Sequence, residues 1–394
     1  MSRGHMAEFV VRQLSGLRVL PSLADVDTSS FPVIGTHNGS FHCDEALACG
    51  MLRCSGQFRA ANVLRTRDAK TLDRCSIVVD VGGVYDADAL RFDHHQPTFH
   101  DTMKTPKSMY RTRLSSAGLV YKHFGREIIQ RYVEAALSSS YRAELLKMGS
   151  WSESRKNLSE AELDTVFDIV YKNFVEHIDG IDNGVNSFGP ATETVTASGC
   201  SADAQSASCV RNYAVTTTLS DRIGRLMPWW NEGGDGNPES ENTAFLQAVE
   251  LALSEFVAAV HFFTFSWMPA RGLVEDAFHA AESVHPSGRI IVLKERFCPW
   301  KDHLLEIEAE HGKVGHVLYV LFSDKSGWRV QAVPKDAVSF ESRKPLPWKG
   351  IRDADLSEAS GVEGCVFVHV SGFIGGNKTY EGALQMATKA LVAV

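Results

Sequence analysis

The stretch FPVIGTHNGSFHCDEALACGMLR (31–53) decides the fold. Its first five residues, FPVIG, form a short apolar run typical of a buried strand, and DEALACGMLR (44–53) has the apolar spacing of a helix. Between them, THNGSFHCDE (36–45) places several titratable side chains directly after the strand. A strand, a loop rich in titratable groups and a helix in this order indicate an α/β fold with a functional site at a strand end.

The same alternation continues along the chain. Further strands are expected at AANVLRT (60–66), SIVVDV (76–81) and ALRF (89–92), and helices over 115–137 and 161–178. This pattern predicts a mostly parallel sheet flanked by helices. A second, smaller α/β domain is predicted from later strands at RIIVLK (289–294), HVLYVLF (316–322), WRVQAV (328–333) and CVFVHV (365–370), followed by a Gly-rich turn and a helix over 379–391.

These patterns divide the chain into four segments. They are an N-terminal extension (1–30), a first α/β domain (31–235), a helical connector (236–288) and a C-terminal α/β domain (289–394). Within the first domain, residues 186–210 are rich in Ser, Ala, Thr and Gly and are predicted to form an exposed insertion. Polar and charged residues interrupt the longest apolar region, Phe245–Met268, so we interpret it as an amphipathic buried helix and expect no membrane partner.

Charge and cysteine usage exclude some classes of protein. The formal net charge of −8, from 40 Lys and Arg against 48 Asp and Glu, excludes broad electrostatic coating of nucleic acid, which needs a basic field. Any role on nucleic acid must therefore rest on a local basic patch or on a bound cation. The eight cysteines form no C-x-x-C pair, which predicts reduced thiols in an intracellular protein.

The N-terminal segment is open to two interpretations. Residues 6–20 have a helical pattern that includes Arg12 and Arg18, as in a mitochondrial presequence, but Glu8 counts against import. The alternative is a plain N-terminal helix. Localisation in the mitochondrion, the nucleus or the cytoplasm therefore stays open.

Four clusters of titratable residues follow predicted strands or end a predicted helix. They are His37, His42 and Asp44; Asp80; Asp93, His94 and His95; and Asp179 with Asp182. Three of the clusters lie at the carboxyl ends of strands in a predicted parallel sheet, where side chains far apart in sequence converge. Imidazole and carboxylate groups without thiolates suit Mn²⁺ or Mg²⁺ better than structural zinc.

Each cluster also has a simpler interpretation. Asp44 is suited to capping the helix that follows it, and Asp179 and Asp182 are suited to be solvated acids at a helix end. Asp80 is harder to explain in this way, because a carboxylate in a buried strand needs a partner or a cation. Together the clusters predict a site for two divalent ions, with Asp80 placed to bridge them.

The complete set resembles the four motifs of the DHH phosphoesterase superfamily and, within it, the MYG-type exonuclease family. Similar stretches run from residue 35 to 387 and include GTHNGSFHCDEALACGML, VVDVGGVYD, RFDHHQ, EHIDGIDNG and SGFIGGNKTYEGALQMA. The resemblance implies an N-terminal DHH-type catalytic domain with a mostly parallel sheet and two divalent ions, usually Mn²⁺. It also implies a smaller C-terminal α/β domain across a cleft.

The resemblance assigns roles to individual residues. It matches five residues to metal-ligand positions, which are His37, Asp44, Asp80, His94 and Asp179. His95 matches a position that contacts the scissile phosphate. The superfamily has an Asp where this chain has His42, which is still able to bind a metal but carries no negative charge.

Substrate-binding residues are expected in both domains. GFIGGNK (372–378) is expected to be a turn between a strand and a helix, and the resemblance favours anion binding there over a plain turn. Its candidate residues are Gly375, Gly376, Asn377 and Lys378. Arg65, at the end of a strand in the first domain, is expected to face the same cleft or to form a salt bridge. RKPLPWKGIR (343–352) is suited either to single-stranded nucleic acid or to an exposed basic loop.

The leading hypothesis is a metal-dependent phosphodiesterase, a 3′–5′ exonuclease on RNA or short single-stranded nucleic acid. The expected ligands of two ions, Mn²⁺ or alternatively Mg²⁺, are His37, His42, Asp44, Asp80, His94 and Asp179. Asp93 and His95 are the expected catalytic residues. A small-molecule phosphohydrolase acting on pyrophosphate, a nucleotide or a dinucleotide is the alternative, and a metal-stabilised RNA-binding or scaffold protein is a third. The sequence leaves the oligomeric state open.

Overall fold

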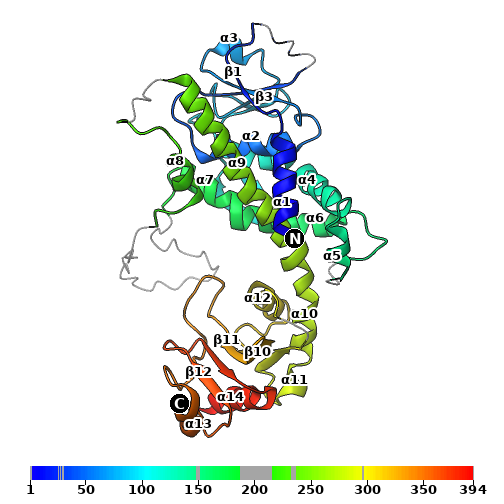
Figure 1. Ribbon diagram of the computed structural model, residues 1–394, viewed down its shortest axis with the longest axis vertical. Coiled ribbons are helices and arrows are strands. Elements are labelled where there is room, and N and C mark those ends of the chain that lie inside the picture. Colours follow the sequence, from blue (N-terminus) through cyan, green and yellow to red (C-terminus); the bar gives the residue numbers. More distant parts are fainter. Residues whose placement is uncertain are drawn as a thin grey trace, which may run out of the picture. The chain divides into compact units, whose positions relative to one another are not determined.

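The computed structural model describes residues 2–24, 26, 28, 31–147, 151–186, 215–231, 237–294 and 297–393. The chain forms two compact units, Met1–Phe263 and Thr264–Val394 (Figure 1). The boundary between the units falls inside the predicted connector (236–288). The predicted insertion (186–210) lies outside the described residues except for its first residue. The cleft expected between the domains stays a prediction.

A six-stranded sheet forms the centre of the first unit. Its strands are, in spatial order, β1 (Val19–Leu20), β3 (Asn62–Arg65), β2 (Val33–Thr36), β4 (Ile77–Val79), β6 (Arg91–Phe92) and β5 (Tyr85–Asp86). Neighbouring strands run parallel except for β5 and β6, which are antiparallel. All residues of β2 and β4 are buried, as is typical of strands covered on both faces. The prediction of a mostly parallel sheet is confirmed.

Helices surround this sheet. They are α1 (Ser2–Leu14), α2 (Cys43–Cys54), α3 (Ala69–Leu72), α4 (Ser116–Leu137), α5 (Arg142–Lys147), α6 (Glu160–Val170), α7 (Glu176–Asp182), α8 (Leu219–Gly224) and α9 (Pro238–Phe262). A π-helical turn, η1 (Tyr171–Val175), joins α6 to α7, and the hairpin of β7 (Thr102–Lys104) and β8 (Met109–Arg113) precedes α4. Helix α2 packs on both α4 and α9, so all of its residues are buried.

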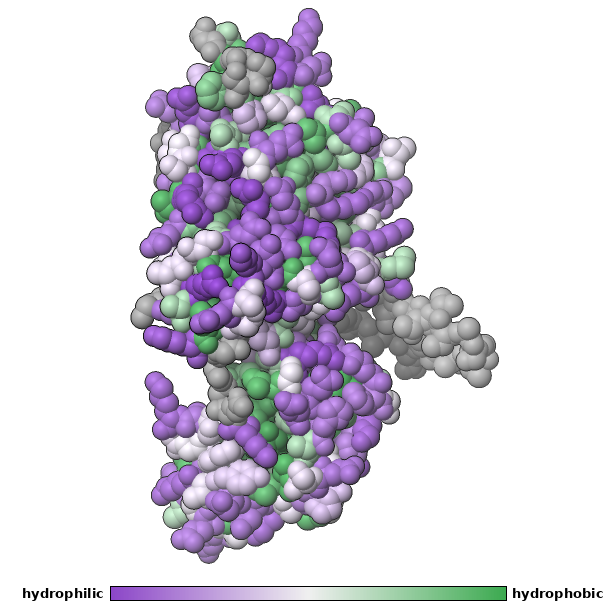
Figure 2. Space-filling model, turned by 90° about the vertical axis from the view of Figure 1, so that its right-hand side faces the viewer, coloured by the Kyte–Doolittle hydropathy of each residue, from purple (hydrophilic) through white to green (hydrophobic). Residues whose placement is uncertain are grey.

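Helix α9 continues through a second π-helical turn, η2 (Phe263–Trp267), into α10 (Met268–His279). This continuous helix is, among the described residues, the one long and apolar enough to cross a membrane by length and composition. More than half of its most apolar window is buried inside the protein, and core helices of soluble proteins pass the same test. Phe245 and Phe256 on α9 are fully buried, and the face of the first unit in Figure 2 is mainly hydrophilic. The interpretation as an amphipathic buried helix is confirmed.

Helix α1 is part of the first unit's packed structure. Phe9 and Val10 are buried, and α1 lies against α9 (Figure 1). Arg53 of α2 donates hydrogen bonds to the backbone carbonyls of Gln13 and Ser15 at the end of α1. The segment is therefore a helix with a structural role, and a further role as a targeting peptide stays a prediction.

The second unit is a smaller α/β unit with a five-stranded sheet. Its strands are, in spatial order, β12 (Cys365–Val368), β13 (Ile374–Asn377), β11 (Gly327–Ala332), β10 (Tyr319–Asp324) and β9 (Ile290–Leu293). Its helices are α10, α11 (Ala281–Val284), α12 (Lys301–Glu310), α13 (Asp353–Ser360) and α14 (Tyr380–Val392). Only β9 and β10 pair in parallel.

The predicted Gly-rich turn in the second unit is wrong, because Gly375 and Gly376 lie in strand β13, hydrogen-bonded between β11 and β12. A Cβ atom on Gly375 would lie 2.9 Å from Leu346 Cδ1, and one on Gly376 would lie 2.7 Å from Arg329 Nη1. These glycines therefore allow neighbouring segments of the second unit to pack closely against β13, which is one of the reasons for glycine inside a strand.

Part of the basic segment RKPLPWKGIR (343–352) packs within the second unit. The Arg343 guanidinium donates to both carboxylate oxygens of Glu308, at 2.8 and 2.7 Å, and Glu308 is fully buried. Lys344 Nζ donates to the carbonyl of Leu391, and Trp348 packs against the core of the unit. These three side chains pack within the second unit, whereas Lys349 and Arg352 are exposed, so a role of the segment on nucleic acid stays a prediction.

We expect Glu308→Ala to destabilise the second unit by about 3–5 kcal/mol, because it leaves the Arg343 charge buried without a partner. Urea unfolding followed by tryptophan fluorescence measures this change. Glu341→Ala, which removes the partner of Lys335 in an exposed pair, is the matched control and should change stability very little. Equal effects of the two substitutions would contradict the structural role of the buried pair.

Candidate metal centre

The candidate site is built around the N-terminal end of α2. Strand β2 ends at Thr36, and His37 is the next residue. His42 immediately precedes α2, and its backbone N–H donates to the Glu45 carboxylate at 2.8 and 3.0 Å. Asp44 and Glu45 both lie in the first turn of the helix and are fully buried. Acidic groups are favoured there by the partial positive charge of a helix N-terminus.

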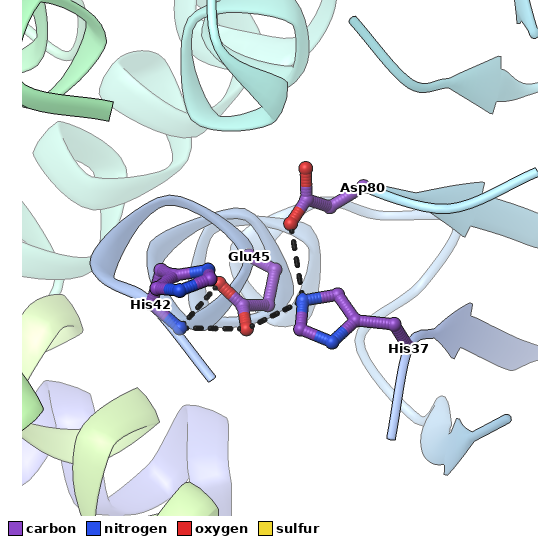
Figure 3. Close-up of side chains that lie close together, drawn as sticks. All are labelled: His37, His42, Glu45 and Asp80. Atoms are coloured by element: carbon purple, nitrogen blue, oxygen red, sulfur yellow. Dashed lines mark hydrogen bonds and ion pairs between the residues drawn. The ribbon is translucent and has the colours of Figure 1, made fainter. Parts of the chain in front are cut away.

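The His37 imidazole joins two of the buried carboxylates (Figure 3). Its Nε2 atom lies 3.1 Å from Glu45 Oε1 and 3.2 Å from Asp80 Oδ2, and the picture shows the two carboxylates approaching this nitrogen from different elements. Burial by itself lowers the pKa of His37, but the hydrogen bonds to Asp80 and Glu45 raise it to about 10. In the metal-free protein, the protonated His37 imidazole therefore joins the carboxylates of Asp80 and Glu45.

Asp80 occupies a constrained backbone position directly after β4. Its φ of +60° lies in the left-handed region, which is uncommon for residues other than glycine and is often found at functional sites. Ser116 donates a hydrogen bond to Asp80 Oδ1, which also lies 3.4 Å from His94 Nε2. Burial opposes ionisation, but the nearby imidazoles of His37 and His94 lower the pKa of Asp80 below its usual value.

His94 repeats the arrangement of His37 on the other side of Asp80. Its Nε2 atom lies 3.1 Å from Asp182 Oδ2 and near Asp80 Oδ1, although neither contact has hydrogen-bond geometry. Burial lowers the pKa of His94, but the carboxylates of Asp182 and Asp80 raise it to about 10. His94 Nε2 thus lies between two carboxylates, as His37 Nε2 does.

The carboxylate of Asp44 provides the test of whether a metal fits. Both of its oxygens are buried and accept no hydrogen bond within the described part of the chain. Burial, with repulsion from Asp80 and Asp182, raises the pKa of Asp44 well above its usual value. A buried polar group without a partner costs about 1–3 kcal/mol, and more if charged, so a bound cation is the natural partner of this side chain.

Three overlapping groups of donor atoms have the spacing of metal sites. Within each group the atoms lie within 4.8 Å of one another, and the groups are His37, His42, Glu45 and Asp80; Asp80, His94 and His95; and His42, Asp44 and Asp182. Asp80 and His42 each belong to two groups. The donors are carboxylate oxygens and imidazole nitrogens, which fit Mn²⁺ or Mg²⁺.

Of the two acids at the end of α7, the structure places Asp182 in a donor group and Asp179 outside the three groups, so metal binding by Asp179 stays a prediction. The Asp179 carboxylate is buried and accepts hydrogen bonds from the backbone and hydroxyl of Ser115 and from the hydroxyl of Tyr171, outside the three groups. Burial raises the pKa of Asp179 to about 7 despite these bonds. Asp182, three residues later, is the residue that contacts His94. The sequence placed both acids at the helix end but did not decide which of them reaches the site.

Glu45 is a site residue that the sequence analysis missed. The signal that pointed to it was its place three residues after His42 at the start of α2, which is the spacing of a capping box. In the structure its carboxylate makes that contact with the His42 backbone and also reaches His37. A residue that caps a helix is thereby also a candidate metal ligand.

Asp93 positions His95 and does not itself belong to a donor group. One of its oxygens accepts from the backbone of Gly83 at 2.6 Å, and the other lies 2.7 Å from His95 Nδ1. The His95 ring is 62% exposed. It lines a pocket of about 270 Å³ together with Phe41, His42, Cys43, Ile181, Asp182, Ser220 and Gly224. His95 thus faces a space beside the donor groups.

The other predicted substrate-binding residues are used within their own units. The Arg65 guanidinium donates to the Gly39 carbonyl and to Asn242 Oδ1, and it lies over the ring of Phe245. The Asn377 side chain is buried and donates to the Glu363 carbonyl. Of the Gly375–Lys378 group, Lys378 alone is an exposed residue. The Arg65 and Asn377 side chains thus already have hydrogen-bond partners within the protein, and substrate binding by them stays a prediction.

The fold and this site define a metal-dependent enzyme of the phosphoesterase class. The family model MYG1 exonuclease, described as "Uncharacterised protein family (UPF0160)", matches residues 33–391. The chain belongs to this family. The family expected from the sequence is therefore confirmed, and with it the expectation of a hydrolase.

Relatives match over most of their length. The MYG1 exonuclease of Rattus norvegicus is 44% identical over 366 residues, covering 91% of this chain and 84% of the relative. The MYG1 exonuclease of Homo sapiens is 43% identical over 366 residues, which cover 91% of this chain and 86% of the relative. The crystal structure of exonuclease RecJ bound to manganese is 12% identical, covers 99% of this chain and 95% of that chain, and has a TM-score of 0.20. At that TM-score the likeness carries no argument.

We expect Asp44→Asn to stabilise the metal-free protein by about 1–3 kcal/mol. Folding raises the pKa of this carboxyl, so the side chain lowers stability at neutral pH, and the amide removes that cost. The same change should weaken Mn²⁺ binding by about 100-fold. Urea unfolding of metal-depleted protein and calorimetric Mn²⁺ titration measure the two effects. Asp88→Asn, at an exposed acid, should alter neither, and a less stable Asp44→Asn protein with normal Mn²⁺ affinity would refute the role of Asp44.

We also expect Mn²⁺ binding to release protons. His37 and His94 have pKa values of about 10 in the metal-free protein, so both are protonated at neutral pH, whereas a nitrogen that binds a metal must be neutral. Affinity should therefore rise with pH up to about 10. Calorimetry in two buffers with different heats of ionisation counts the protons, and His94→Gln should release fewer. A heat of binding independent of the buffer would contradict this prediction.

Proposed function

We propose that this protein is a metal-dependent 3′–5′ exonuclease that acts on RNA or short single-stranded nucleic acid, using two divalent cations, with Mn²⁺ preferred. The observation that carries the proposal is the buried, unpartnered carboxylate of Asp44 beside His42 and Asp182. The relatives named MYG1 exonuclease, which cover most of this chain, support the reaction class.

The donor groups offer ligands for two ions that share Asp80. His37 and Glu45 lie on one side of Asp80, and His94 with Asp182 lies on the other. When bound, a pair of divalent cations lowers the pKa of a coordinated water and neutralises charge that develops on a phosphoryl group. Ser116 supports the shared carboxylate through its hydrogen bond to Asp80 Oδ1.

His95 is the group that would meet the substrate phosphate. Its Nδ1 is held by Asp93, so its Nε2 is left to face the pocket. The contact between Asp93 and Nδ1 fixes the direction of the His95 ring. Asp93 is thus a positioning residue for His95. Phe41 and Ile181 give the same pocket apolar walls that exclude water from part of the site.

A small-molecule phosphohydrolase is the second candidate, and the size of the pocket favours it. About 270 Å³ lies below the usual range of drug-sized ligand pockets, and it suits a pyrophosphate or one terminal nucleotide. An exonuclease also needs room for only the terminal nucleotide at this point. Pyrophosphate and RNA therefore belong in the same assay.

We expect Mn²⁺-dependent shortening of 5′-labelled single-stranded RNA as a ladder, with mononucleotide released at once from 3′-labelled RNA. Asp182→Asn should lower the rate by about 10- to 100-fold and weaken Mn²⁺ binding, because Asp182 belongs to a donor group. Asp179→Asn is the matched control, since it should lower stability and leave Mn²⁺ affinity nearly unchanged.

Three outcomes would count against the proposal. Immediate mononucleotide release from the 5′ label would reverse the direction. Phosphate release from pyrophosphate at rates well above RNA cleavage would favour the second candidate. Intact RNA in the presence of Mn²⁺-loaded protein would exclude the nuclease activity itself.

A further inference from the structure

A second cavity lies at the opposite end of α2 from the donor groups. Its volume is about 610 Å³, and it is lined by the last turns of α1 and α2, the loop after α2 and one face of α4. Helix α2 has 12 residues and therefore spans about 18 Å from its first turn to this cavity. All of its residues are buried, so the protein core separates the two places.

Four arginines line this cavity, which is an unusual concentration in a chain of net negative charge. They are Arg12 from α1, Arg53 at the end of α2, Arg59 from the following loop and Arg131 from α4. Glu134 is the one acid in the lining, and Glu127 lies nearby, where it accepts a hydrogen bond from the Gly56 backbone. Positive charge therefore exceeds negative charge around this space.

None of the four guanidinium groups is ion-paired to a carboxylate in the described part of the chain. Arg53 is 3% exposed, and its three donor nitrogens are bonded to the carbonyls of Gln13, Ser15 and Ala61. Arg131 Nε donates to the Cys54 carbonyl. These bonds fix the direction of the two arginines but leave their charge without a counter-charge, which is costly for the buried Arg53.

The remaining two arginines are free to turn into the cavity. Arg12 and Arg59 are exposed, and the Arg12 guanidinium lies over the ring of Phe9 at 5.7 Å from its centroid. Planar guanidinium groups match phosphate oxygens in pairs of hydrogen bonds. Two arginines held by hydrogen bonds and two exposed arginines around one space are suited to a ligand with more than one negative charge.

We propose that this cavity, formed by α1, α2 and α4, binds a phosphorylated small molecule of nucleotide size through Arg12, Arg53, Arg59 and Arg131. A phosphate monoester carries nearly two negative charges at neutral pH, which a single carboxylate does not. The volume lies within the usual range of small-molecule sites, and Phe9, Ala60 and Ala135 provide apolar surface beside the arginines.

The site is independent of the proposed nuclease reaction. It contains no member of the three donor groups, and it includes residues of α1 that lie before the family match begins at residue 33. Binding of the phosphorylated molecule is therefore a property that this chain can have whether or not it cleaves nucleic acid.

Calorimetric titration of metal-depleted protein at low salt tests the proposal with three probes. AMP and ribose 5-phosphate carry the phosphate monoester and distinguish a nucleotide from a sugar phosphate, whereas adenosine lacks the phosphate. We expect AMP to bind and adenosine not to bind. Arg12→Ala and Arg59→Ala should each weaken AMP binding by about tenfold, which is the loss of one hydrogen bond to a charged group.

Two controls separate this site from others. Arg3→Ala changes an exposed arginine on the same helix, nine residues from Arg12 and thus about 180° around it, and should leave AMP binding unchanged. Asp182→Asn, in the metal centre, should also leave it unchanged. Failure of both AMP and ribose 5-phosphate to bind at millimolar concentration, or AMP binding unaffected by Arg12→Ala and Arg59→Ala, would overturn the proposal.

Discussion

The main physical constraint on the first unit is that several carboxylates, which repel one another, are gathered at the start of α2. Asp44, Glu45, Asp80 and Asp182 come from three elements and meet where little solvent screens them. In the metal-free protein, two protonated histidines neutralise part of this charge, and Asp44 is left without any partner. Cations at the donor groups would take the place of those protons, so metal binding and proton release at this site are linked.

Helix α2 connects this constraint with the rest of the first unit. Its N-terminal turn presents the acids, its middle packs on α4 and α9, and its C-terminal turn carries Arg53 and Cys54. Because every residue of the helix is buried, it is able to hold its two ends in a fixed relation. The candidate metal centre and the arginine-lined cavity thus lie at the acidic and basic ends of one core helix.

The sequence predicted the two α/β parts and the parallel order of the first sheet well, because buried parallel strands are continuous apolar runs that alternate with helices. It was wrong for GFIGGNK, since a glycine-rich segment has the same composition in a turn and in a tightly packed strand. It was also wrong for Arg343, whose partner Glu308 lies 35 residues away and is brought close only by folding. Composition does not show which charges are paired.

By itself, the sequence determined the chemistry of the site, since His37, Asp80 and His94 follow strands of one parallel sheet and must converge at one edge. Only the tertiary structure decided between Asp179 and Asp182. The π-helical turn η1 lies just before α7, and one extra residue in a helix rotates everything after it by about 100°. A regular helical repeat counted along the sequence therefore does not predict which way the Asp179 and Asp182 side chains point. The hydrogen bonds from Ser115, in a segment distant in sequence, and from Tyr171, one turn of η1 before α7, hold the Asp179 carboxylate outside the donor groups to which Asp182 belongs.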